Sequence, residues 1–186
     1  MGRVDRVKKI VKLIVALNIF LLVVLYFFIN GFNICDISQN LSIIITISIA
    51  LVSLINKYLW KFKVFKILFD PPPNLNGKWK GIIINTKDKK KQEMQLSINQ
   101  TYLEVYIKVS VERGDSNTWV GDIIKINNND WKLIWNWHSS NEAGEFSGTT
   151  VLNILDDKTI KGFYYTNSNI DGRGCTAGKF EAKKIE

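Results

Sequence analysis

Residues 131–138 read WKLIWNWH, and this stretch decides the fold class of the C-terminal part of the chain. Every second position from Trp131 to Trp137 is a tryptophan or a leucine, and the intervening face carries a lysine, an asparagine and a histidine. Because successive side chains of a strand point to opposite faces, this period of two predicts a β-strand with one buried face.

The same alternation continues on both sides of this stretch. Eight strands are predicted, and clusters of Asn, Asp, Gln, Thr and Lys at 99–101, 127–130 and 156–158 mark turns between them. Eight short strands without intervening helices favour a barrel or a sandwich. Glycines beside large aromatic residues on the inner face favour a compact, closed, antiparallel up-and-down β-barrel of minimal lipocalin-like form. The predicted strands cover residues 77–85, 92–99, 102–111, 118–126, 131–138, 146–154, 159–166 and 175–183.

The N-terminal part has a different pattern. Residues 10–29 are apolar except for Lys12 and Asn18, and residues 37–55 form a second apolar run with interspersed Ser and Thr. A run of about 20 apolar residues matches the thickness of a bilayer, so the sequence predicts two transmembrane helices. Lysine and arginine flank both runs but are absent from residues 30–40 between them. By the positive-inside rule, we expect a multi-pass membrane protein with both termini in the cytoplasm.

These patterns divide the chain into three parts. We expect a two-helix hairpin at residues 1–56, a basic, aromatic, interfacial linker at 57–73, and a cytoplasmic β-barrel domain at 74–186. The formal net charge is +8. Residues 1–73 carry nine Lys/Arg and three Asp/Glu, whereas residues 74–186 carry sixteen and fourteen. Since most of the excess lies beside the apolar runs, direct DNA or RNA binding is not expected.

The alternation also sorts the connections between strands into two ends of the barrel. Tight turns lie at the end where the chain arrives from the linker, and four longer loops, at 86–91, 112–117, 139–145 and 167–174, lie at the other end. Binding residues usually concentrate on such loops. We choose candidate ligand-binding residues that lie at this end, and we favour strand residues whose side chains should point into the barrel. The candidates are Trp137, Tyr164, Thr166 and Arg173, with Arg113 and Trp119 in reserve.

Two of these candidates have a chemical rationale of their own. Trp137 can stack on a base, although a tryptophan on this face is more often part of a core. Arg173, between two glycines, offers a guanidinium and backbone amides that suit a phosphate, and a plain flexible loop is an equal alternative.

Residues for catalysis or metal binding are sparse. The chain has one histidine and two cysteines, at His138, Cys35 and Cys175, and none of them is close to another in sequence. His138 has no serine nucleophile or metal ligand placed beside it by the strand pattern. We therefore expect no enzyme activity, no metal site and no cofactor.

Several motifs together carry a family resemblance. The barrel opens on a P-x-L-x-G-x-W-x-G motif at residues 73–81, and an I-x-G-x-Y strand follows at 160–164. With two apolar helices and a basic aromatic linker, the chain resembles the two-transmembrane, β-strand-rich membrane effectors of bacterial cyclic-oligonucleotide-based antiphage signalling systems (CBASS). The resemblance implies a location in the bacterial inner membrane and a barrel that binds a cyclic dinucleotide as its activating ligand. It further implies that binding drives homo-oligomerisation, disrupts the lipid bilayer and kills the infected cell.

Two alternatives remain open at this point. A membrane-tethered, lipocalin-like carrier would bind a small apolar ligand in an apolar mouth and would not need Arg173. A membrane-anchored scaffold would have a filled barrel and bind no ligand. The predicted order of large and small residues is compatible with all three.

Overall fold

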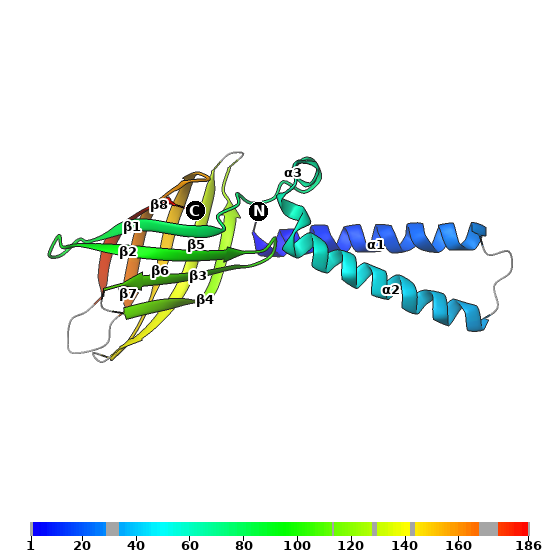
Figure 1. The fold of residues 1–186 in the computed structure, drawn as a ribbon, viewed down its shortest axis with the longest axis horizontal. Helices are drawn as coiled ribbons and strands as arrows, with labels where there is room; N and C mark the ends of the chain where they lie inside the picture. Colours follow the sequence, from blue (N-terminus) through cyan, green and yellow to red (C-terminus); the bar gives the residue numbers. More distant parts are fainter. Residues whose placement is uncertain are drawn as a thin grey trace. The chain divides into compact units, whose positions relative to one another are not determined.

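The computed structural model describes residues 2–28, 34–112, 114–127, 130–141, 144–167 and 175–185. The chain from Val4 to Pro71 forms one compact unit, which is helical, and the chain from Pro72 onward forms the other, which is all β (Figure 1).

The helical unit contains two long helices and two short ones, α1 (Arg3–Phe28), α2 (Ile34–Lys57), the 3-10 helix η1 (Leu59–Lys61) and α3 (Lys63–Phe69). Within this unit, the Ser48 hydroxyl of α2 donates a hydrogen bond of 2.8 Å to the Asn18 side-chain oxygen of α1. This side-chain hydrogen bond joins the two long helices.

The short helix α3 ends at a residue in the left-handed conformation. Its last residue is Phe69, and Asp70 follows in the left-handed conformation with φ 47° and donates its backbone N–H to the Lys66 carbonyl. This is a common way to end a helix, and the prolines that follow cannot continue it.

The expectation of two transmembrane helices is wrong. Within the part of the chain that the structure describes, no helix is long and apolar enough to cross a membrane. The membrane-anchored fold class and the multi-pass inner-membrane location are corrected accordingly.

The β unit is a closed, eight-stranded antiparallel barrel. Each strand pairs with the next along the chain, and β8 closes the ring by pairing with β1. The predicted up-and-down barrel is thus confirmed. Its strands are β1 (Gly77–Asn85), β2 (Lys91–Gln100), β3 (Val105–Val111), β4 (Gly114–Lys125), β5 (Trp131–Asn141), β6 (Gly144–Asp156), β7 (Thr159–Asn167) and β8 (Thr176–Lys184).

The side chains that face the barrel interior are those that the sequence alternation predicts. Large apolar side chains from all eight strands form one contiguous core, which includes Leu133, Trp135, Ile160 and Phe180. The Trp135 and Phe180 rings meet edge to face, with centroids 5.7 Å apart. Burial of these aliphatic and aromatic groups is the main favourable term in the folding of the barrel.

The two ends of the barrel differ from each other. The end at which β1 begins is closed by buried side chains. Trp79 is fully buried there, and its indole N–H donates to the Leu75 carbonyl at 2.9 Å. The buried Gln100 side chain accepts from the Leu75 N–H at 2.8 Å and donates to the Pro73 carbonyl at 3.0 Å. The polar groups named here are therefore buried with hydrogen-bond partners, as buried polar groups usually are. We call it the sealed end.

At the opposite end, strands extend into two of the four predicted loops. The β3–β4 ladder extends to the Val111–Gly114 pair, and the β5–β6 ladder continues to Asn141. Residues 114–117, 139–141, 144 and 145 therefore belong to strands, whereas the sequence analysis places them in loops. Polar residues end the sequence alternation here, but strand pairing uses backbone groups and does not require apolar side chains.

A β-bulge explains the register of β4, which the sequence leaves ambiguous. The β4–β5 ladder shifts between Thr118 and Val120, so that Trp119 has no cross-strand partner in it. Before the bulge even-numbered side chains point inward, and after it odd-numbered ones do, with Ile123 buried. An inserted residue changes the parity of a strand, and simple alternation cannot show where this happens.

Candidate functional site

A cavity of about 250 Å³ lies inside the barrel at the end opposite the sealed end. We call this the open end. The cavity is bordered by seven strands, because residues near the far ends of β1, β3 and β4 to β8 meet there. Its lining consists of Ile83, Val109, Val111, Gly114, Asp115, Ser116, Trp135, Trp137, Ser139, Phe146, Thr150, Tyr164, Thr166 and Phe180.

Trp137 forms one wall of the cavity and is held from two sides. It pairs across the ladder with Gly148, and a Cβ atom at Gly148 would come within 2.5 Å of the Trp137 ring. Its indole N–H donates to the Thr150 hydroxyl at 3.1 Å, and Thr150 is 1% exposed. The ring therefore lies along the wall with its polar atom already satisfied, which leaves its face for stacking.

Tyr164 forms a second wall in the same way. It pairs with Gly178, and a Cβ atom there would come within 2.5 Å of Tyr164 Cζ. Burial raises the pKa of the Tyr164 hydroxyl above its ordinary value, and the nearby charge of Asp88 raises it further. The hydroxyl is therefore neutral at physiological pH and can both donate and accept a hydrogen bond.

The polar groups of the cavity are mostly hydroxyls. Ser139 uses its hydroxyl to donate to the Asp115 carbonyl at 2.7 Å, and Ser116 and Thr166 add two more. The Asp115 carboxylate is engaged outside this group, because it forms an ion pair of 2.5 Å with Lys108. The hydrogen bond from Lys108 lowers the pKa of Asp115. Among the described lining residues the cavity thus presents aromatic faces and neutral polar atoms.

A second hollow of about 230 Å³ adjoins the cavity and shares Ile83 and Tyr164 with it. It lies at the β1–β2 loop, and we call it the loop groove. Its charged lining consists of two lysines and two carboxylates, Lys90, Lys91, Asp88 and Glu112. Lys90 and Asp88 are 4.0 Å apart, which is the limit of an ion pair.

The structure brings three of the six predicted ligand-binding residues together. Trp137, Tyr164 and Thr166 all line the cavity. Their role in binding stays a prediction. The two arginines, Arg113 and Arg173, lie outside the described residues.

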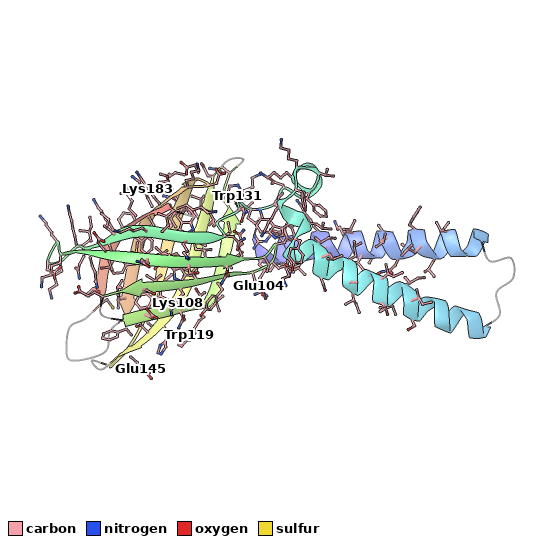
Figure 2. All side chains as sticks on the ribbon, in the orientation of Figure 1. Glu104, Lys108, Trp119, Trp131, Glu145 and Lys183 are labelled. Atoms are coloured by element: carbon pink, nitrogen blue, oxygen red, sulfur yellow. The ribbon has the colours of Figure 1, made fainter. Side chains whose placement is uncertain are left out.

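Trp119 does not reach the cavity. The bulge turns it to the outer wall, where it is 67% exposed and stacks on the His138 ring at a centroid distance of 5.1 Å (Figure 2). The rings are nearly parallel, with an angle of 5° between them. His138 is thus on the outer face, as the alternation predicts, and Trp119 belongs to that face as well.

Sequence reasoning missed several lining residues, and parity could have found some of them. Ser139 and Thr150 follow the inward positions of their strands, but as small polar residues they do not stand out in an apolar pattern. Phe146 pairs with Ser139 and extends the same inward face. Phe146 and Thr150 fall on alternate positions of the predicted strand 146–154, and Ser139 continues the alternation of Trp135 and Trp137 one step beyond the predicted strand 131–138.

Comparison with known proteins places this geometry in a family. No curated protein sequence matches the chain. One similar solved structure, described as "Structure of EF1p2_mFAP2b bound to DFHBI", has 11% sequence identity and a TM-score of 0.41. That match covers 60% of this chain and 94% of that one. Residues 71–184, which include the whole barrel with its cavity, match the family described as "Cap15, cyclic dinucleotide receptor domain", and the chain belongs to this family.

Proposed function

We propose that this chain is an antiphage effector that binds a cyclic dinucleotide at the open end of its barrel. The observation that carries the proposal is that the matched receptor domain contains a cavity with aromatic walls and neutral hydroxyl groups. Nucleobases stack on aromatic side chains, and each stacked base contributes about 1–3 kcal/mol. Trp137 and Tyr164 are the residues that would supply these faces.

We propose further that binding drives homo-oligomerisation through the helical unit. Described helix residues expose large apolar side chains, and soluble monomers rarely expose large contiguous apolar patches. Self-association would remove such surface from water. Examples are Val15, Ile19 and Phe20 of α1 and Ile43, Ile47 and Ile49 of α2. Death of the infected cell is the expected consequence, and disruption of its inner membrane stays a prediction, measurable as dye entry into cells.

A catalytic role is not part of the proposal. Activation of a hydroxyl nucleophile needs a base within hydrogen-bond reach. Among the described residues of the cavity, the Asp115 carboxylate is paired with Lys108, and His138 lies on the outer wall against Trp119. We therefore propose that the ligand is bound and not turned over, which chromatography of the recovered ligand would test.

The direct test is calorimetric titration of the purified full chain with a panel of cyclic dinucleotides and, separately, with fatty acids. We expect saturable binding of at least one cyclic dinucleotide and an increase in oligomer size by sedimentation when it is present. Binding of a fatty acid without binding of any cyclic dinucleotide would overturn the proposal in favour of an apolar-ligand carrier.

A further inference from the structure

The cavity is too small for a whole cyclic dinucleotide. Such a ligand has two bases, two riboses and two phosphates, and ligands of that size occupy pockets of about 300–1,000 Å³. The cavity measures about 250 Å³. Only part of the ligand can therefore enter it.

The charge of the lining decides which part can enter. An ionised phosphate is costly to bury unless it is paired with a cation and fully hydrogen-bonded. Among the described residues, no lysine, arginine or histidine lines the cavity, and its carboxylate, Asp115, is paired with Lys108. A neutral base meets no such penalty, and hydroxyls such as those of Thr166 and Tyr164 can either donate to its edge or accept from it.

The aromatic walls favour the same assignment. Trp137 lies against Gly148 and Tyr164 lies against Gly178, so both rings follow the wall and keep the space between the strands open. The Trp137 indole N–H is already bonded to Thr150. What Trp137 offers a ligand is therefore a flat apolar face, which suits a base and does not suit a phosphate.

The loop groove lies where the charged part of the ligand would emerge. It adjoins the cavity at Tyr164 and carries Lys90 and Lys91. Asp88 and Glu112 also line it, so the groove is neutral before binding. Since the Lys90–Asp88 ion pair spans 4.0 Å, a phosphate can compete with this carboxylate for the lysine at little cost.

We propose that the cavity takes one nucleobase of the ligand in its neutral form, and that the adjoining phosphate stays outside, in the loop groove beside Lys90 and Lys91. The inference rests on the proposed function and deepens it. The barrel then reads one base from within, and the second base remains at the surface, free to contact another molecule.

The first test uses nucleosides as probes, because they carry the base without the phosphate. Uridine, cytidine, adenosine and guanosine are titrated into the full chain while the bound cyclic dinucleotide is followed by competition. We expect at least one nucleoside to displace it and to change tryptophan fluorescence, and inorganic phosphate at equal concentration to do neither. Displacement by phosphate and by no nucleoside would overturn the assignment.

The second test fills the cavity. Val111→Phe adds a ring to the lining, and it should weaken both nucleoside and cyclic dinucleotide binding by about tenfold or more. Val120→Phe is the matched control, since Val120 is exposed on the strand that carries the bulge and does not line the cavity. Its binding should change less than about twofold. Unchanged binding by folded Val111→Phe would contradict the inference, and the nucleoside competition decides it if that variant does not fold.

The third test addresses the loop groove. Lys91→Gln should weaken cyclic dinucleotide binding about two- to fivefold and flatten its salt dependence, while nucleoside binding stays unchanged. Equal loss for both ligands, or no loss for either, would refute the placement of the phosphate. The outcome that would refute the proposed function is a different one, because the wild-type chain would then bind no cyclic dinucleotide at all.

Discussion

Two tryptophans on the same inner face should respond to truncation in opposite ways. Trp79 is fully buried at the sealed end, and Trp79→Ala would leave a cavity where the whole indole had been. Replacing a buried tryptophan by alanine costs about 3–5 kcal/mol of unfolding free energy. About 1 kcal/mol of this is the hydrogen bond that its N–H donates to the Leu75 carbonyl at 2.9 Å. Ligand affinity should change little, because Trp79 does not line the cavity.

Trp137→Ala should show the reverse. The side chain is only partly buried and borders a cavity that already exists, so little new void forms when it is removed. We expect a loss of about 1–2 kcal/mol in stability, mainly from the indole bond to Thr150 and lost apolar contact. Cyclic dinucleotide binding should weaken by about 1–3 kcal/mol, the contribution of one stacked base.

Denaturant unfolding followed by circular dichroism measures the first quantity, and calorimetric titration measures the second. The linear-extrapolation slope must be the same for both variants if their stabilities are to be compared. Trp79→Phe keeps a ring and removes the N–H, and it should lie between wild type and Trp79→Ala. The reasoning fails if Trp79→Ala costs less than about 1 kcal/mol, or if Trp137→Ala costs as much stability as Trp79→Ala.

Four further changes test separate parts of the account. Gly148→Ala would place a Cβ atom 2.2 Å from the Tyr165 carbonyl oxygen and 2.5 Å from the Trp137 ring, so it should lower stability and weaken ligand binding, which thermal melts and titration would show. Since burial raises the pKa of Tyr164 in the folded state, the unfolded chain ionises first, so stability should fall above about pH 10. Tyr164→Phe should remove part of that fall in thermal melts. Arg173→Ala should weaken binding by about 1.5–3 kcal/mol and leave the melting temperature unchanged, and unchanged affinity would exclude its role. Deletion of residues 1–56 should abolish cell killing while nucleotide binding persists.

The barrel could be predicted from the sequence because its signal is local and repeated. Period-two alternation recurs in every strand, and turn residues separate the strands at the sealed end. Predicted and observed strand ends mostly agree within two residues. The largest differences occur where polar residues continue a ladder, as at Asn141, since alternation in polarity is weak there.

The register of β4 could not be predicted, for a physical reason. The sequence TWVGDIIKI from Thr118 contains apolar residues at both parities, and only the bulge at Trp119 reconciles them. Where the ladder shifts depends on the pairing of β4 with β5, which is a relation between strands distant in sequence. Trp119 was accordingly expected among the ligand-binding candidates and lies on the outer wall instead.

In the helical part, the prediction from composition is wrong. Apolar runs at residues 10–29 and 37–55 were interpreted from composition as membrane spans. Length and apolar content are necessary for a span, but charges within the run count against it. Within the part of the chain that the structure describes, however, no helix is long and apolar enough to cross a membrane.

Cross-strand pairing decides where the barrel is solid and where it is hollow. Toward the sealed end, Leu133 pairs with Leu152, and two large side chains on neighbouring strands fill the interior between them. Toward the open end, Trp137 pairs with Gly148, and its ring lies against the small partner instead of extending across the barrel. A sequence records which residues are large, but not which residue stands opposite each one. The cavity follows from those pairings, and it therefore becomes visible only once the register of the eight strands is known.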